Sequence, residues 1–185
     1  VGALYEPLFY MNNLKDDPTK LEPLMGKSYT ISDDAKTIDV TIRDGEKWSD
    51  GEPYTTEDVA YTFNLLNSNK ALNTSGFAGS AKVLSDTEVR ITLDKPESVN
   101  ALSYLSGTMI VPKHVWEKID DPVTYTNKDA VGSGPFTVKG GNFSPTAYTF
   151  KKNPYYWDEG KPEIDGVRYV LITGGTQASQ NALTA

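Results

Sequence analysis

The fold is decided by residues 37–66, TIDVTIRDGEKWSDGEPYTTEDVAYTFNLL. Apolar and polar side chains alternate over residues 37–43, which predicts a half-buried β-strand. Asp44-Gly45 and Asp50-Gly51 are turn dipeptides, because glycine accepts a positive φ and aspartate bonds its own backbone. Thr55 and Asp58 have the spacing of a capping box, so a helix is expected from residue 56 to about residue 67. The stretch therefore predicts a strand, a turn-rich corner and an amphipathic helix.

Outward from this stretch, further strands and helices are expected. The sequence predicts hairpins over 29–32 with 37–43, 82–84 with 88–93, and 136–139 with 147–151. Short helices are expected after Ser98, which has the chemistry of an N-cap, and after Pro112. The run 167–172 is strongly β-prone and predicts a central strand, and residues 176–185 suggest a helix.

Composition excludes several functional classes. The 185 residues carry a net charge of −7, which argues against a nucleic-acid partner and against a polybasic membrane patch. No apolar run approaches the roughly 20 residues that a transmembrane helix needs. The chain contains no cysteine, which excludes thiolate metal sites and cysteine nucleophiles. We expect no metal, no cofactor and no signal peptide in this chain.

Four segments resemble the extracellular solute-binding proteins of family 5, which are the oligopeptide-, dipeptide- and nickel-binding components of ABC importers. The first runs from Ile42 to Phe63 and includes KWSDG and TEDVAYTF. The others are IVPKHVW at 110–116, VGSGPF at 131–136 and NPYYW at 153–157. The resemblance covers nearly the whole chain, and a match of this length is specific.

The resemblance implies a mixed α/β fold, one lobe of a class II periplasmic-type binding protein with a mixed sheet and antiparallel hairpins. We interpret residues 1–185 as a single domain, an N-terminal lobe fragment whose second lobe is absent. We also expect the first strand of the family to be absent, because Tyr5-Glu6 comes so early in this sequence. Excision from a longer protein and a naturally short paralogue are the two explanations, and excision is preferred.

The function that the resemblance implies is capture of a solute outside the cytoplasm and its delivery to ABC permease subunits, without catalysis. A peptide is the leading ligand class, and nickel chelates and oligosaccharides are the alternatives. We expect a monomer in the periplasm or at the outer face of the membrane, held there by a lipid anchor that this chain lacks. By resemblance, the cleft face includes the ligand-binding candidates Tyr5, Glu6, Gly76, Phe77, Ser106, Gly107, Thr108 and Met109.

Three other functions are weighed against solute capture. Ser133 and His114 could form a hydrolase pair, although Gly-Ser-Gly-Pro is not a nucleophile elbow. The rings of Tyr155, Tyr156 and Trp157 could stack on sugars in a carbohydrate-adhesion module, but a packing corner is the preferred interpretation. Asp44, Glu46, Asp50 and Glu52 lack the spacing of a calcium loop, so a solvated turn is expected there.

Overall fold

The computed structural model describes residues 2–17 and 19–172. Twelve elements follow one another along this part of the chain: β1 (Phe9–Tyr10), β2 (Glu22–Pro23), β3 (Gly26–Ile31), β4 (Thr37–Ile42), α1 (Thr56–Ser68), β5 (Gly79–Val83), β6 (Glu88–Leu93), α2 (Ser98–Gly107), α3 (Lys113–Trp116), β7 (Phe136–Ser144), β8 (Ala147–Lys152) and β9 (Gly166–Val170). Every strand pair formed by these residues is antiparallel, and the strands make three separate sheets. The fold is thus mixed α/β, as predicted.

The main sheet has the strand order β3-β4-β6-β5. Its inward face carries alternate side chains of β4 and β6, so that Ile38 and Val40 lie opposite Ile91 and Val89. Helix α1 packs against β5 and β6. Phe63 from this helix is fully buried and lies 5.0 Å from the ring of Phe77. The alternation of apolar and polar residues in the sequence therefore produces the hydrophobic core between this sheet and α1.

The corner between β4 and α1 is built around the carboxylate of Asp58. Its Oδ2 accepts hydrogen bonds from the backbone amide of Thr55 (2.8 Å) and from the indole of Trp48 (3.3 Å), while Oδ1 accepts one from the backbone amide of Lys113 (2.8 Å). The capping interaction predicted from the sequence is confirmed. It also orients Trp48 and the start of α3, so this one carboxylate joins three segments.

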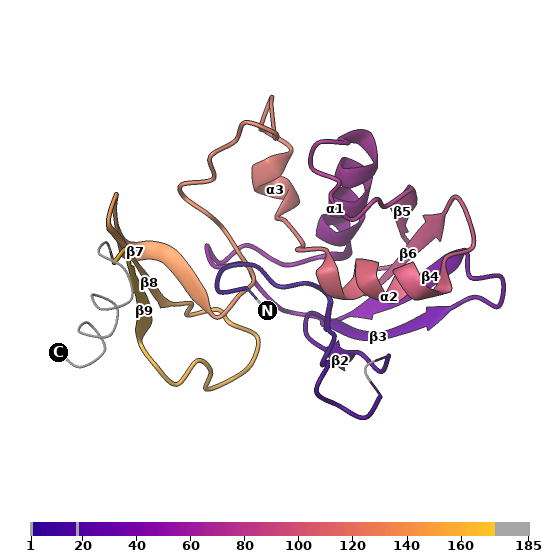
Figure 1. The fold of residues 1–185 in the computed structure, drawn as a ribbon, viewed down its shortest axis with the longest axis horizontal. Helices are drawn as coiled ribbons and strands as arrows, with labels where there is room; N and C mark the ends of the chain where they lie inside the picture. Colours follow the sequence, from indigo (N-terminus) through magenta and orange to yellow (C-terminus); the bar gives the residue numbers. More distant parts are fainter. Residues whose placement is uncertain (1, 18, 173–185) are drawn as a thin grey trace.

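The second large sheet, β7-β8-β9, stands at the opposite end of the molecule from the main sheet (Figure 1). The register of β7 against β8 shifts between Thr137 and Asn142. Gly140 has a φ of +74°, and a Cβ on Gly141 would lie 2.0 Å from the carbonyl oxygen of Thr149. The two glycines therefore let the hairpin bend where other residues would clash.

Some predicted boundaries differ from the structure. β3 and β5 each begin about three residues before the predicted strands, at Gly26 and Gly79. Ser98 is the first residue of α2 and not its N-cap; Glu97 takes that position. The predicted run 167–172 contributes to strand β9, which covers Gly166–Val170 and lies at the edge of the described sheet and not at its centre. The helix expected over 176–185 lies outside the described residues.

Candidate functional site

Glu6 is the centre of a junction at which the N-terminal segment meets the VGSGPF and NPYYW motifs. The hydroxyl of Tyr156 donates to Oε1 of Glu6 at 2.8 Å, and the indole nitrogen of Trp157 donates to Oε2 at 2.7 Å. The backbone amide of Glu6 donates to Oγ of Ser133 at 3.2 Å. Glu6 is fully buried. We call these four residues the Glu6 junction, and its role is to fasten the N-terminal segment to the two later motifs.

The glycines of VGSGPF allow the backbone contacts at this junction. Amides of Gly134 and Phe136 donate to the carbonyls of Leu4 and Ala3, at 2.8 and 3.0 Å. A Cβ on Gly132 would lie 1.8 Å from the carbonyl oxygen of Leu4, which no side chain could tolerate. The requirement for glycine is therefore one of close backbone approach.

The first motif joins the same assembly through Ser49. Its backbone amide donates to the carbonyl of Gly132 at 3.0 Å, and its hydroxyl oxygen accepts a bond from the amide of Gly132 at 3.1 Å. Asn153 joins the NPYYW motif to the same assembly, because its side-chain amide donates to the carbonyl of Gly134 at 2.9 Å. Three of the four segments that carry the family resemblance are thus neighbours in space.

Burial raises the pKa of the Glu6 carboxyl above its ordinary value, and the hydrogen bonds from Trp157 and Tyr156 oppose that rise. Burial also raises the pKa of Tyr156, with the neighbouring Glu6 charge adding to the effect. The Glu6 carboxyl and the Tyr156 hydroxyl are hydrogen-bonded to each other inside the protein. Glu6, which was predicted to contact ligand, therefore stabilises the interior of the lobe.

Tyr5 lies beside Trp116, the last residue of α3, and beside Asn127 in the loop that follows this helix. Its hydroxyl oxygen accepts a 2.9 Å hydrogen bond from the side-chain amide of Asn127. Burial raises the pKa of Tyr5. The Oδ1 atom of Asn127 and the indole nitrogen of Trp116 are buried without a hydrogen-bond partner among the described residues. The sequence prediction included Tyr5 but missed Asn127, whose isolated position in a polar loop gives no periodic signal.

The structure brings the segment 106–109 beside Tyr5-Glu6. Pro7 and Met109 form an antiparallel bridge, and the amide of Ile110 donates to the carbonyl of Glu6 at 3.3 Å. Gly107 is exposed, and Met109 is 41% exposed. Thr108 is buried, and its hydroxyl has no partner among the described residues. Ser106 is half-buried and donates to the carbonyl of Leu102 at 2.8 Å.

The two other predicted ligand residues, Gly76 and Phe77, differ in their exposure. Gly76 is exposed in a turn with a φ of +70°. Phe77 is 2% exposed and packs against Phe63 and Tyr104, with ring centroids 5.0 and 5.3 Å apart. Since Tyr104 lies on α2, Phe77 supports the helix that leads to segment 106–109.

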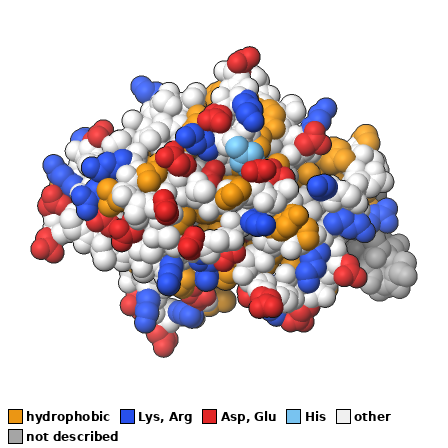
Figure 2. Space-filling model, turned by 180° about the vertical axis from the view of Figure 1, so that it is seen from behind, with side chains coloured by type: hydrophobic (Ala, Val, Ile, Leu, Met, Phe, Trp, Pro, Cys, Tyr) orange, Lys and Arg blue, Asp and Glu red, His pale blue; other side chains and the backbone are white. Residues whose placement is uncertain are grey.

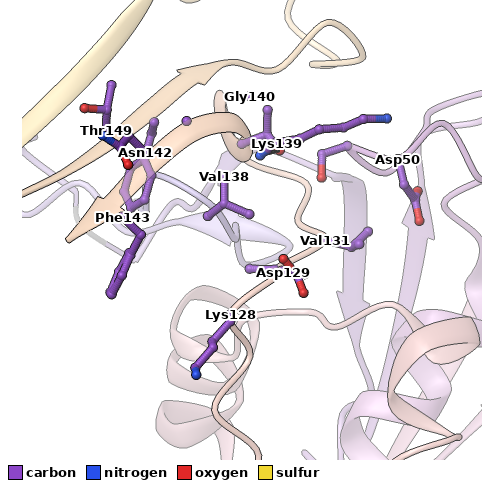
Figure 3. A pocket seen from close by; sticks show the side chains of 15 residues that line it. Asp50, Lys128, Asp129, Val131, Val138, Lys139, Gly140, Asn142, Phe143 and Thr149 are labelled. Carbon is purple, nitrogen blue, oxygen red and sulfur yellow. Dashed lines mark hydrogen bonds between the residues drawn. The ribbon is translucent and has the colours of Figure 1, made fainter. Parts of the chain in front are cut away.

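A hollow of about 390 Å³ lies between the β7–β8 hairpin and the loop that follows Asn127. In Figure 3 the side chain of Val138 points toward the part of the loop that carries Asp129 and Val131. Lys128 and Lys139 stand at its border. No local sequence pattern predicts this hollow, because residues 49–50, 128–131, 137–143 and 149–150, which line it, are far apart in the chain.

The hydrolase alternative is not supported by the geometry. Oγ of Ser133 is buried and accepts the amide of Glu6. Nε2 of His114 lies 2.9 Å from Oδ2 of Asp50, so the two candidate side chains have different partners. Figure 2 shows the single histidine on the molecular surface with acidic side chains next to it.

The carbohydrate-adhesion alternative is not supported either, because only one of the three aromatic rings proposed to stack on sugars is exposed. Tyr155 is 41% exposed, whereas Tyr156 and Trp157 are half-buried and bonded to Glu6. The guanidinium carbon of Arg43 lies 4.1 Å from the centroid of the Trp157 ring, which covers that ring further.

Two general properties follow from the described part of the chain. Residues 2–17 and 19–172 contain no group of three or more His, Asp or Glu side chains arranged to hold a metal ion. Within the same ranges, every helix is too short or too polar to cross a membrane.

Comparison with known proteins identifies the family. The dipeptide-binding protein DppE of Bacillus subtilis (strain 168) is 26% identical to this chain over 88% of it and 34% of DppE. The peptidoglycan-binding protein YepA of Agrobacterium fabrum is 33% identical over 93% of the chain and 28% of YepA. The crystal structure of the ABC transporter substrate-binding protein CtaP of Listeria monocytogenes superposes with a TM-score of 0.81 at 28% identity, covering 98% of this chain and 36% of CtaP.

This chain therefore spans about a third of the length of the relatives it matches. The family model described as bacterial extracellular solute-binding proteins, family 5 Middle, matches residues 20–185. The chain belongs to the family 5 extracellular solute-binding proteins.

Proposed function

We propose that this chain is the part of an extracytoplasmic solute receptor that forms one wall of the ligand site, and that the solute is a peptide. The observation that carries the proposal is the pairing of the Tyr5 segment with Thr108-Met109 beside the Glu6 junction, in a chain of family 5. We also propose that the protein delivers the solute to ABC permease subunits and that it is a monomer. It would act in the periplasm or at the outer face of the membrane, held there by a lipid anchor.

Of the eight predicted ligand residues, five have surface to offer a solute. Gly76, Gly107 and Met109 are exposed, and Tyr5 and Ser106 are half-buried. Glu6 and Phe77 are buried and act as supports. Thr108 is buried, and its hydroxyl has no hydrogen-bond partner among the described residues.

A peptide suits such a wall because backbone groups are recognised by hydrogen bonds while side chains need only roomy surroundings. The similarity to the dipeptide-binding protein DppE supports the peptide class, and the similarity to the peptidoglycan-binding protein YepA makes peptidoglycan the second candidate. Family 5 proteins bind solutes, and the one hydrolase pair considered, Ser133 and His114, has its two side chains bonded to Glu6 and Asp50 instead.

One wall without its opposite wall can hold a peptide only weakly. We expect a dissociation constant of about 1 mM or weaker for residues 1–185 on their own, since one wall by itself neither encloses the peptide nor contacts it from both sides. Titration of the 185-residue chain with a pool of di- and tripeptides, followed by two-dimensional NMR, should shift the amide signals of Gly107 and Met109.

Met109→Lys should weaken these shifts, whereas Val99→Lys on the exposed side of α2 should leave them unchanged. Shifts confined to residues 128–143 would place the ligand in the hollow of Figure 3 and overturn the proposed wall. Micromolar binding, or turnover of any peptide, would contradict the proposal as a whole. Independently of this titration, native mass spectrometry of the full-length protein would identify the class of a co-purified solute.

A further inference from the structure

The hydroxyl of Tyr5 belongs to a cluster of polar groups that come from three segments of the chain. Asn127, in the loop that follows α3, donates to the hydroxyl oxygen at 2.9 Å from a position 122 residues later. Burial raises the pKa of Tyr5, and the nearby N–H groups of Asn127 and Trp116 oppose that rise. The ring of Trp116 packs edge-on against that of Tyr125, with the centroids 5.5 Å apart. We call Tyr5, Trp116 and Asn127 the Tyr5 cluster.

Three hydrogen-bonding groups of the Tyr5 cluster are not used by the described residues. The indole nitrogen of Trp116 is a buried donor and Oδ1 of Asn127 is a buried acceptor, and neither has a partner among these residues. The bond from Asn127 uses only the oxygen of the Tyr5 hydroxyl, so its hydrogen is also available. Because buried polar groups are almost always hydrogen-bonded, a small polar partner is expected between them.

A single water molecule has the chemistry that these three groups require. It can accept from the indole of Trp116 and the hydroxyl of Tyr5 while it donates to Oδ1 of Asn127, which makes the roughly three hydrogen bonds typical of a buried water. A metal ion does not fit, because an indole N–H is a donor only. A peptide does not fit either, because protein covers both the indole nitrogen and Oδ1.

We propose that Tyr5, Trp116 and Asn127 hold one ordered water, and that through it Trp116 and Asn127 act as positioning residues for Tyr5 on the ligand wall. The water is inferred from the hydrogen-bonding groups alone. The positioning role rests on the proposed function, in which the half-buried Tyr5 contacts the solute. Holding this side chain in one rotamer before the solute arrives reduces the entropy that is lost on binding.

The water is tested by NMR on the ¹⁵N-labelled 185-residue chain. The chain has three tryptophans, and two of them are internal controls, because the indoles of Trp48 and Trp157 donate to the carboxylates of Asp58 and Glu6. The indole proton of Trp116, assigned by the loss of its signal in Trp116→Phe, should alone show a nuclear Overhauser cross-peak to a long-lived water. The absence of this cross-peak would overturn the proposal.

Two substitutions at Asn127 separate its side chain from its backbone. Asn127 has a φ of +46°, which glycine adopts freely and aspartate tolerates. Asn127→Gly removes Oδ1 without straining the loop, so the Trp116 cross-peak should disappear. Asn127→Asp keeps an acceptor at the same place, so the cross-peak should remain. Unchanged amide signals in β4 and β6 would show that both variants are folded. A cross-peak that persists in Asn127→Gly would contradict the proposed role of Oδ1.

Tyr5→Phe distinguishes a bound water from the hydroxyl proton of Tyr5. Trp116 and Asn127 still bind the water in this variant, so the cross-peak should remain. Its loss would mean that the signal came from the hydroxyl proton, and the water would be withdrawn.

The positioning role is tested by the peptide titration described above, read at the amides of Gly107 and Met109. Asn127→Gly should weaken binding by about three-fold or more, and Asn127→Asp should bind within about two-fold of the original chain. Val123→Ala, an exposed position in the same loop, is the control and should change nothing.

Equal binding by Asn127→Gly and the original chain would overturn the positioning role. An original chain that shows the Trp116 cross-peak but binds no peptide would overturn the proposed function, and the positioning role with it, while the water would stand.

Discussion

The hydroxyl of Tyr156 donates a 2.8 Å hydrogen bond to Oε1 of Glu6, a residue 150 positions earlier in the chain. The contact joins the N-terminal segment to the segment between β8 and β9. Because Glu6 is fully buried, the two donors that face its carboxylate are needed for its stability there. The Tyr5-Glu6 segment is held in place by this pair, and with it the proposed ligand wall.

Replacing Glu6 by alanine should lower the free energy of unfolding by about 2–4 kcal/mol, because the buried donors of Tyr156 and Trp157 lose their acceptor. Urea denaturation followed by tryptophan fluorescence measures the change. Glu159→Ala is the matched control, since Glu159 is exposed and should change stability by less than about 0.5 kcal/mol. Equal effects of the two substitutions would show that the junction contributes nothing to stability.

Glu6 should also give the protein a distinctive pH dependence. Its pKa is raised in the folded state, so its stabilising contribution is full below the ordinary carboxyl value of 4.5 and is lost as the pH rises through the raised value. Asp39 and Glu97 have lowered pKa values, so their contributions to stability change with pH in the opposite direction. The stability of the original chain must therefore be compared with that of Glu6→Gln, which retains Asp39 and Glu97.

The difference in unfolding free energy between the original chain and Glu6→Gln should therefore decrease steadily from pH 4.5 upward, in matched urea titrations. A difference that stays constant over this range would mean that Glu6 has the same pKa in the folded and unfolded states.

Gly132→Ala should prevent stable folding or cost at least about 3 kcal/mol, because the new Cβ would lie 1.8 Å from the carbonyl oxygen of Leu4. Gly107→Ala is the control, since nothing lies within 4 Å of a Cβ at that position and its φ is not positive. Thermal unfolding of both variants compares them. A Gly132→Ala protein as stable as the Gly107→Ala protein would refute the close approach of the two segments.

Phe77→Ala should destabilise the protein by about 3–5 kcal/mol, the usual cost of removing a buried aromatic side chain. Phe77→Leu, which leaves a smaller cavity, should cost less. If Phe77 were instead a ligand-contacting residue at the surface, both variants would unfold at the same urea concentration as the original chain. The experiment thus separates a supporting role from a binding role.

Removing the hydroxyl of Tyr104 should have a smaller effect. Tyr104 donates a 2.6 Å hydrogen bond to Glu97, and burial followed by this bond raises the pKa of Tyr104 to about 12. Tyr104→Phe should cost about 1 kcal/mol and leave the ring contact with Phe77 intact. Ultraviolet titration of the tyrosines should show one fewer group ionising near pH 12.

Local sequence patterns determined the secondary structure well where the physical signal is local. The alternation over 37–43, the Thr55–Asp58 cap and the turn glycines depend on neighbours within a few residues, and the structure contains all of them. The starts of β3 and β5 were less well predicted, because Gly26 and Gly79 extend their strands through pairing with distant residues. The family was evident from four motifs, because each of these motifs is continuous in the sequence.

Only the tertiary structure decided what the individual side chains do. Glu6 and Phe77 belong to segments predicted to face a ligand, yet both are buried, because the acceptor and the ring that they provide are used by Tyr156 and Tyr104. The hollow beside Lys128 and the open edge of β9 were likewise unpredicted. The sequence by itself determined the elements and the family, since these depend on short-range order. Burial and availability depend on residues that are distant in the chain, such as Phe77 and Tyr104 or Glu6 and Tyr156, and only the folded chain brings those together.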